Sequence, residues 1–74
     1  MGKSNTASIF FRENIRTLRF RQKHTLEQMG KLVDLSASHV HCLEKGKREA
    51  SLDIAARFSD VFNCKISKLL ETKI

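Results

Sequence analysis

The sequence predicts an all-α fold in one small domain, and three observations lead to this prediction. Apolar residues recur at the three- and four-residue spacing of a helix in five successive segments, whereas no segment alternates like a strand. Residues that favour helix starts and helix ends separate these segments, and the chain contains no proline. Its 74 residues are enough for one domain with a small core.

The first helix is expected from Ile9 to about Lys23, with Ser8 as its N-terminal cap. The residues that recur at helical spacing in this segment are Phe11, Ile15, Leu18 and Gln22. The preceding stretch, Met1 to Ser8, is small and polar and is expected to form a flexible arm. The folded domain is therefore expected to span residues 9–74.

The second helix is expected to start after Thr25, where Gln28 completes a capping box of the T-x-x-Q type. Its inner face is expected to consist of Met29, Leu32 and Val33. Asp34 follows where the chain must turn. Asp tolerates the left-handed backbone conformation better than most residues other than glycine, so it suits this turn.

The third helix is expected to be capped by Ser36, with Val40 and Leu43 pointing inward because they are three residues apart. Gly46 is expected to end this helix as a left-handed C-terminal cap. Lys45 lies beside that end, where a positive charge is favourable to the helix dipole.

The fourth helix is expected to be capped by Ser51, with Asp53 in its first turn and Asn63 as its left-handed end. Its core stripe is expected to be Leu52, Ala55, Phe58 and Phe62. A short fifth helix is expected around Ile66, Leu69 and Leu70.

The charge of the chain favours a polyanionic partner. Fourteen Lys and Arg face eight Asp and Glu, which gives a formal net charge of +6. The basic residues of the first helix are Arg12, Arg16, Arg19, Arg21 and Lys23, and a second group consists of Lys45, Lys47 and Arg48. The alternative is a solvated basic surface that aids solubility. No apolar run is long enough to span a bilayer and no signal peptide is recognisable, so we expect a cytoplasmic protein without membrane contact.

The run HVHC, His39 to Cys42, raises the question of a metal site. His39 and His41 are two residues apart and face different sides of a helix, so only His39 and Cys42 share a face. A structural zinc site needs four ligands, and the sequence offers no second pair. No nucleophile–base–acid constellation is recognisable either. We therefore expect no metal, no cofactor, no small-molecule ligand and no enzymatic activity. Cys64 is expected to fill a core position after the fourth helix.

Three stretches of the chain, ENIRTLRFRQ, TLEQM and SASHVHCLEKGKR, together resemble the Cro/lambda-repressor-like helix-turn-helix family, also called the xenobiotic-response-element family. The resemblance covers about Phe11 to Leu70, and LEKGKR is its most specific part. It implies a compact lambda-repressor-like bundle of five helices. It also implies that the third helix reads the major groove of DNA, usually from a symmetric dimer.

The chain departs from the family pattern at three positions. Leu26 stands where the family often has a Gln that supports phosphate binding, so backbone N–H groups at that helix start must serve instead. Gly30 replaces the usual Ala at the helix–helix contact; it permits close approach but costs up to ~1 kcal/mol of helix propensity. Asp34 replaces the usual turn Gly.

The exposed face of the third helix offers candidate base-reading residues. They are Ala37, Ser38, His41 and Cys42, and the resemblance implies that Ala37, Ser38 and Cys42 lie where base edges are read. None of these side chains makes the bidentate contacts of Arg, Asn or Gln, so we expect DNA shape to carry much of the specificity. The alternative is that they are merely exposed to solvent.

Phosphate contacts are expected from the basic loop after the third helix and from the starts of the second and third helices. The candidates are Lys45, Lys47, Arg48, Thr25, Ser36 and His39. The resemblance assigns Ser36 to a cap that faces phosphate. It also implies that Arg19 pairs with Glu44 and fixes the first helix to the third.

Ile54 and Val61 are seven residues apart and lie off the core stripe of the fourth helix, and Ile74 ends the sequence. Exposed apolar residues at such spacing suggest a partner surface, so we expect a homodimer through the fourth and fifth helices. The alternative is that these residues tuck into the monomer core. A dimer would place two recognition helices roughly 34–36 Å apart on a pseudo-palindromic operator.

The sequence therefore predicts a sequence-specific DNA-binding transcription regulator that binds double-stranded DNA as a homodimer. In its small size, the chain resembles restriction–modification controller proteins and small phage-type repressors. The alternative is a protein-interaction module, such as an antitoxin or an assembly subunit, whose third helix contacts protein. The weakly discriminating side chains of that helix favour this alternative, whereas the basic loop favours DNA.

Overall fold

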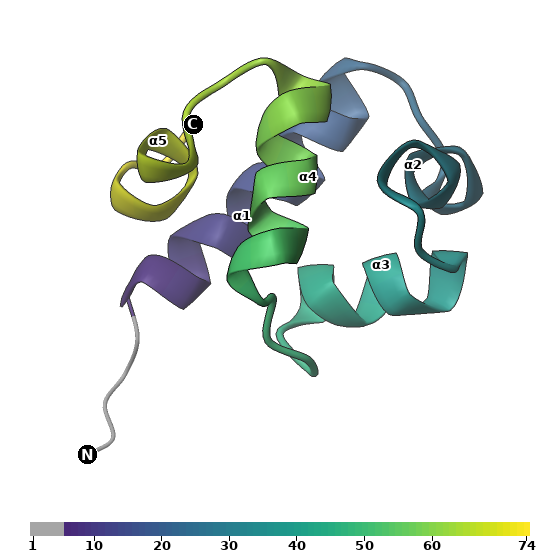
Figure 1. Cartoon of the computed structure of the whole chain (residues 1–74), viewed down its shortest axis with the longest axis horizontal. Coiled ribbons are helices and arrows are strands. Elements are labelled where there is room, and N and C mark those ends of the chain that lie inside the picture. Colours follow the sequence, from purple (N-terminus) through teal and green to yellow (C-terminus); the bar gives the residue numbers. More distant parts are fainter. Residues whose placement is uncertain (1–5) are drawn as a thin grey trace.

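The computed structural model describes residues 6–74, which form five α-helices joined by short turns. These are α1 (Thr6–Arg21), α2 (Leu26–Val33), α3 (Ala37–Lys45), α4 (Leu52–Phe62) and α5 (Ile66–Glu71). Residues 6–74 contain no strand, so the predicted all-α bundle of five helices is confirmed. Figure 1 shows α4 in front of α1 at the centre, with α5 on one side, α2 on the other and α3 along the bottom.

The first helix is shifted toward the N-terminus relative to the prediction. It begins at Thr6 and ends at Arg21, so the predicted bounds were wrong by two or three residues at each end. Thr6, Ala7 and Ser8 include neither glycine nor proline, so the helix continues through them. Ser8 therefore lies inside α1 and is not its cap. At the other end Lys23 has a φ of 61°, which ends the helical path. Residues 1–5, the rest of the predicted arm, lie outside the described residues.

The predicted N-terminal caps of α2, α3 and α4 are all formed. The hydroxyls of Thr25, Ser36 and Ser51 each accept a hydrogen bond from the backbone N–H three residues later, at 3.0, 3.0 and 3.2 Å. The Gln28 side chain accepts from the Thr25 N–H at 2.9 Å, which completes the predicted capping box. Local sequence signals therefore fix three of the five helix starts.

The predicted left-handed helix ends are also present. Asp34 has φ 61° and ψ 47°, Gly46 has φ 78° and ψ 13°, and Asn63 has φ 54° and ψ 46°. The N–H of Gly46 donates back into the last turn of α3, to the carbonyls of Cys42 and Leu43. Asp and Asn occupy this conformation here in place of glycine, as their short polar side chains allow.

All five helices contribute side chains to the core, and Phe58 of α4 is fully buried in it. The Phe58 ring meets Phe11 edge-on at 5.8 Å and stacks with Phe62 at 6.0 Å between centroids. The buried apolar residues are Phe11, Ile15, Met29, Val33, Val40, Leu43, Ala55, Phe58, Phe62 and Leu69. Cys64 is half-buried against this core, and burial raises the pKa of its thiol, which nearby Lys68 lowers in part.

Two residues predicted to be inward are exposed. Leu32 is 49% exposed because Met29, Gly30 and Val33 occupy the inner face of α2. Leu52, the first residue of α4, is 74% exposed. Both predictions, which placed these leucines in the core stripe of their helix, were wrong.

A buried asparagine, which the sequence patterns did not single out, fastens the end of the chain to α1. The Asn14 side-chain amide donates to the carbonyls of Leu69 at 2.9 Å and Thr72 at 2.7 Å, and its Oδ1 accepts from the Ile74 N–H at 2.8 Å. One side chain thus satisfies three backbone groups after and within α5. Among residues 6–74, no helix is both long and apolar enough to cross a membrane.

Candidate nucleic-acid interface

The turn between α2 and α3 packs directly on the backbone of α2. The N–H of Leu35 donates to the Gly30 carbonyl at 2.8 Å. A Cβ on Gly30 would overlap the Leu35 carbonyl oxygen, a backbone atom that cannot move without moving the turn. The missing side chain at Gly30 therefore sets how closely α3 follows α2, which agrees with the close approach expected there.

A buried ion pair holds α3 against α1. Arg19 Nε lies 2.6 Å from Glu44 Oε2, and Arg19 Nη2 lies 3.0 Å from Glu44 Oε1, so the guanidinium and the carboxylate meet in two parallel hydrogen bonds. The two side chains are 9% and 3% exposed. Arg19 Nη1 also donates to the His24 carbonyl at 3.0 Å, which ties in the turn after α1. The pair that the family resemblance implied is therefore present, and it fixes the orientation of α3.

The opposite face of α3 is open to solvent. Ser38, His41 and Lys45 are exposed, and their spacing of three and four residues places them on one side of the helix. Ala37 and Cys42, the other predicted base-reading residues, are partly buried at the edges of this face. Figure 1 shows α3 in the lower part of the molecule, below α2.

The basic loop after α3 continues from that face. Lys45, Lys47 and Arg48 are all exposed, and none of them forms an ion pair within residues 6–74. The Lys47 N–H donates to the Cys42 carbonyl at 2.9 Å, so the loop backbone closes the end of the helix. The three side chains remain available for an anion.

The starts of α2 and α3 offer fewer free groups for binding an anion than their sequence suggests. Thr25 is exposed, but its N–H already bonds Gln28 in the capping box, so the N–H groups free for an anion belong to the residues that follow. Ser36 is exposed, and its Oγ accepts from the N–H of His39, which leaves the hydroxyl proton for a further acceptor. His39 itself is partly buried.

The histidines and cysteines do not assemble into a cluster. Within residues 6–74, no three side chains of the His, Cys, Asp and Glu types lie close enough together to hold a metal ion. His39 and Cys42 are one helical turn apart but have no further partners of these types.

The residues predicted to form a dimer surface are not the exposed apolar residues of the molecule. Ile54, Val61 and Ile74 are each partly buried and pack against the core, so the expectation that they are exposed was wrong. The cause is that α4 is flanked by α2 and α5, whose side chains cover its sides. The exposed large apolar residues within 6–74 are Ile9, Phe20, Leu32 and Leu52.

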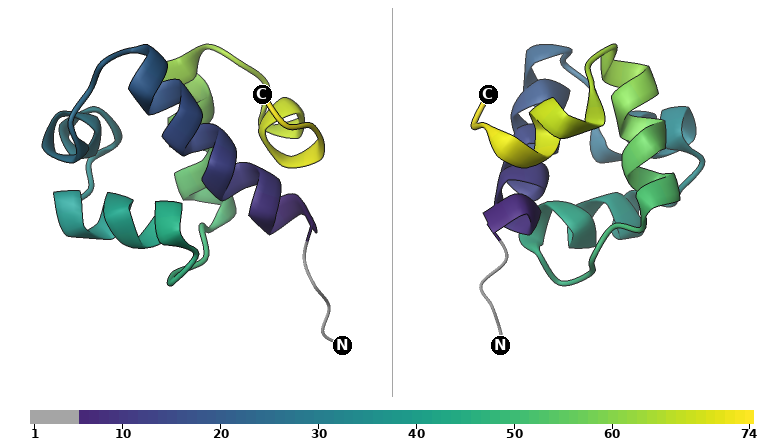
Figure 2. Two further views of the ribbon diagram at one scale, coloured as in Figure 1. Left: turned by 180° about the vertical axis from the view of Figure 1, so that it is seen from behind. Right: turned by 60° about the vertical axis from the view of Figure 1, so that its left-hand side comes forward.

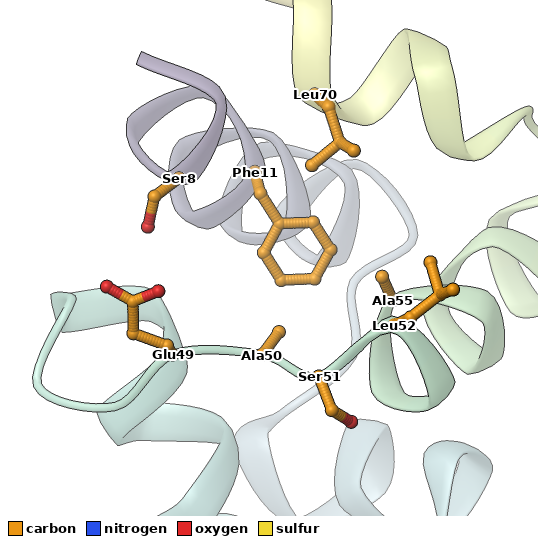
Figure 3. A pocket seen from close by; sticks show the side chains of 8 residues that line it. All are labelled: Ser8, Phe11, Glu49, Ala50, Ser51, Leu52, Ala55 and Leu70. Carbon is orange, nitrogen blue, oxygen red and sulfur yellow. The ribbon is translucent and has the colours of Figure 1, made fainter. Parts of the chain in front are cut away.

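Leu52 stands beside an apolar cleft of about 220 Å³ between the start of α4, α1 and α5. Figure 3 shows the Phe11 ring in the middle of this cleft, with Leu70 on one side and Ala50, Ala55 and Leu52 on the other. Leu52 belongs to the rim of the cleft and is largely exposed to solvent. Leu52 was predicted to lie in the core because the apolar character of a residue does not indicate which helix ends are covered by other helices.

Comparison with known proteins gives one family and one similar structure. A family model described as helix-turn-helix matches residues 15–69. The crystal structure of the P22 c2 repressor protein in complex with synthetic operator 9T in the presence of Tl+ is similar, with a TM-score of 0.77 and 24% sequence identity. The alignment covers 82% of this chain and 92% of that chain, and it establishes the same fold. A search of the curated proteins gives no match.

Proposed function

This chain belongs to the helix-turn-helix family, and on this premise we propose that it is a DNA-binding transcription regulator that inserts α3 into the major groove. One observation carries the proposal. The buried Arg19–Glu44 pair holds α3 rigidly, while the open face of the helix runs into a loop of unpaired cations. A rigid helix beside positive charge suits the groove and the phosphates that line it.

Base contacts in this proposal come from Ser38 and His41 at the centre of the open face, with Ala37 and Cys42 at its edges. Hydroxyl, imidazole and methyl groups make single contacts with base edges, so direct readout is modest. Sequence-dependent bending and groove width then supply the remaining specificity.

Phosphate contacts come from Lys45, Lys47 and Arg48, and from the capped starts of α2 and α3. The Ser36 hydroxyl donates its remaining proton to a phosphate oxygen. Thr25 and His39 contact the phosphate backbone of the same DNA. These contacts fix the register of α3 on the duplex, whereas the bases determine which duplex is bound.

We also propose that the regulator binds as a homodimer on a pseudo-palindromic operator. The support is the pairing of a protruding apolar residue, Leu52, with an apolar cleft beside it. Under a two-fold axis, each copy can place its Leu52 over the cleft of the other, which buries both surfaces at once. The partly buried residues Ile54, Val61 and Ile74 would then support this interface from behind.

The proposed function is tested by DNA binding to the region upstream of the chain's own gene. The assay measures affinity at two salt concentrations in the presence of non-specific competitor DNA. We expect one site to be bound at least about a thousandfold more tightly than competitor, as for specific regulators. Equal affinity for all duplexes at both salt concentrations would contradict a sequence-specific regulator.

Lys47→Ala tests the phosphate assignment. Because a phosphate contact carries no base information, the variant should weaken binding to every duplex by a similar factor and reduce the slope of log K against log salt by about one unit. Lys65→Ala, which removes another exposed charge at the residue before α5, is the matched control and should leave the slope unchanged. An effect of Lys47→Ala confined to one operator position would overturn the assignment.

A second candidate function is a protein-interaction module that uses the same open face of α3. The observation that favours it is the absence of Arg, Asn and Gln from the candidate base-reading residues, which are Ala37, Ser38, His41 and Cys42. Such a module would bind DNA weakly and without sequence preference, so the upstream-region assay separates the two functions.

A further inference from the structure

A second cationic surface lies outside the helix-turn-helix, on the outer side of α1. A cleft of about 450 Å³ opens between α1, the last turn of α3 and the segment after α5. We call it the α1 cleft, and its four cations are Arg12, Arg16, Lys45 and Lys73. The left view of Figure 2 shows α1 from this side, crossing in front of α4 with α3 below it.

The positive charge of the α1 cleft is not neutralised from within. None of its four cations forms an ion pair with any of residues 6–74. Glu44 also lines the cleft, but both of its oxygens are taken by Arg19. Glu13 is the remaining carboxylate of the lining, so cations outnumber uncompensated anions there by four to one.

One of these cations is held in position by an aromatic ring. Phe20 is 55% exposed on the cleft wall, and Arg16 Cζ lies 5.2 Å from its ring centroid. A guanidinium that stacks on an aromatic face keeps its N–H edges free for two-point contact with a phosphate. The ring therefore orients Arg16 without occupying its hydrogen-bonding groups.

The α1 cleft is continuous with the basic loop. Lys45 belongs to both, and the Arg12 guanidinium lies directly against Gly46, the residue that opens the loop. A series of unpaired cations thus runs from Lys47 and Arg48, past Gly46, along the outer side of α1.

We propose that the α1 cleft binds backbone phosphates of the same DNA duplex, beyond the base pairs that α3 covers. The proposal rests on the proposed function, because it extends the phosphate contacts of the loop. A regularly spaced polyanion matches a continuous series of cations, and the loop proposed to contact the same duplex lies directly beside Arg12. An acidic protein segment is the competing occupant, and the experiment below distinguishes it.

The experiment compares two duplexes that carry the same preferred site, selected from a random pool. One is trimmed to the base pairs covered by α3, and the other is extended by about ten base pairs, one helical turn, on each side. The variant is Arg16→Gln with Lys73→Gln. The matched control is Lys65→Gln with Lys68→Gln, which removes the same charge from the exposed start of α5. Circular dichroism establishes that each variant is folded.

On the extended duplex, we expect the slope of log K against log salt to be smaller by about two units for the cleft variant. The ratio of its affinities at 50 and 200 mM salt should then be roughly tenfold smaller than that of the wild type. On the trimmed duplex, it should match the wild type. Lys73→Gln alone should lose about one unit, so the test stands if the double variant does not fold.

A cleft variant that behaves like the control on both duplexes overturns the proposal while leaving the proposed function intact. In that case the cleft would fit an acidic protein segment instead. If the wild type shows no preferred site in any duplex, the proposed function fails, and the DNA assignment of the cleft fails with it.

Discussion

Arg19 neutralises the carboxylate of Glu44, whose side chain is almost fully buried. We predict that Arg19→Ala lowers the free energy of unfolding by about 3–5 kcal/mol, since Glu44 would be left as an unpaired buried charge. That loss is comparable to the whole stability of a domain of this size. Urea denaturation followed by circular dichroism measures the change, and DNA affinity should fall with it because α3 loses its anchor. A variant that melts like the wild type would mean that the pair contributes nothing.

Two milder variants separate the effect of burial on the stability of an ion pair from the effect of its charge. Glu44→Gln and Asp53→Asn each replace a carboxylate by its amide, but the Asp53–Arg57 pair is 72% and 37% exposed. An exposed pair on one helix contributes less than about 1 kcal/mol. Glu44→Gln should therefore be the more destabilising of the two.

The Arg19–Glu44 pair could be predicted from the sequence, whereas the role of Asn14 could not. The Arg19–Glu44 pair was predicted because it belongs to a family pattern that the chain matches. Asn14 was missed because its partners are backbone groups more than fifty residues away, and no local pattern marks them. A lone amide between Phe11 and Ile15 on the inner face of α1 was the available signal.

Among the helices, α2 shows two opposing effects at Gly30. Alanine has the higher helix propensity, by about 1 kcal/mol, but its Cβ would overlap the Leu35 carbonyl oxygen. We predict that Gly30→Ala lowers the melting temperature, because a backbone overlap is relieved only by moving the turn that carries α3. Lys31→Ala, at the adjacent exposed position, is the control and should leave the melting temperature nearly unchanged. A more stable Gly30→Ala protein would mean that the turn shifts without cost.

The serine caps of α3 and α4 allow stability to be separated from DNA contact. Ser36 and Ser51 accept the same type of hydrogen bond, so Ser36→Ala and Ser51→Ala should each cost about 1 kcal/mol in thermal denaturation. The proposed phosphate contact belongs to Ser36 alone. DNA affinity, measured well below both melting temperatures, should therefore fall for Ser36→Ala and stay unchanged for Ser51→Ala.

Helix boundaries were predicted well wherever a side chain or a left-handed residue marks them. Thr25, Ser36 and Ser51 at the starts, and Asp34 and Asn63 at the ends, act on the backbone within four residues, so the sequence contains the whole signal. The start of α1 was misplaced because a serine that suits a cap is also accepted inside a helix.

At the scale of the whole molecule, the sequence did not indicate which apolar side chains remain exposed, and the dimer interface through Ile54, Val61 and Ile74 stays a prediction. Amphipathic spacing tells which residues share a side of a helix, but only the packed bundle decides which sides remain open. Ile54 and Val61 share a side of α4 and are partly covered, whereas Leu52 at the start of the same helix is not.

We predict that Leu52→Asn weakens the homodimer at least tenfold, because a polar group would face the apolar cleft of the other copy. Leu32→Asn, at the other strongly exposed leucine, is the control. Analytical ultracentrifugation over a concentration series measures both. A wild-type protein that stays monomeric at micromolar concentration and binds DNA only as a monomer would refute the dimer.

The three hydrogen bonds of Asn14 join residues that are 55, 58 and 60 positions apart, whereas Arg19 and Glu44 are 25 apart and the caps act within a single turn. The entropy lost in closing a loop grows with its length. Folding is therefore favoured to proceed from the short-range contacts of α2, its turn and α3 toward the closure of the chain at Asn14. By this order, the unit of α2, its turn and α3 is assembled early, and the polar bonds at residue 14 are among the last native contacts to form.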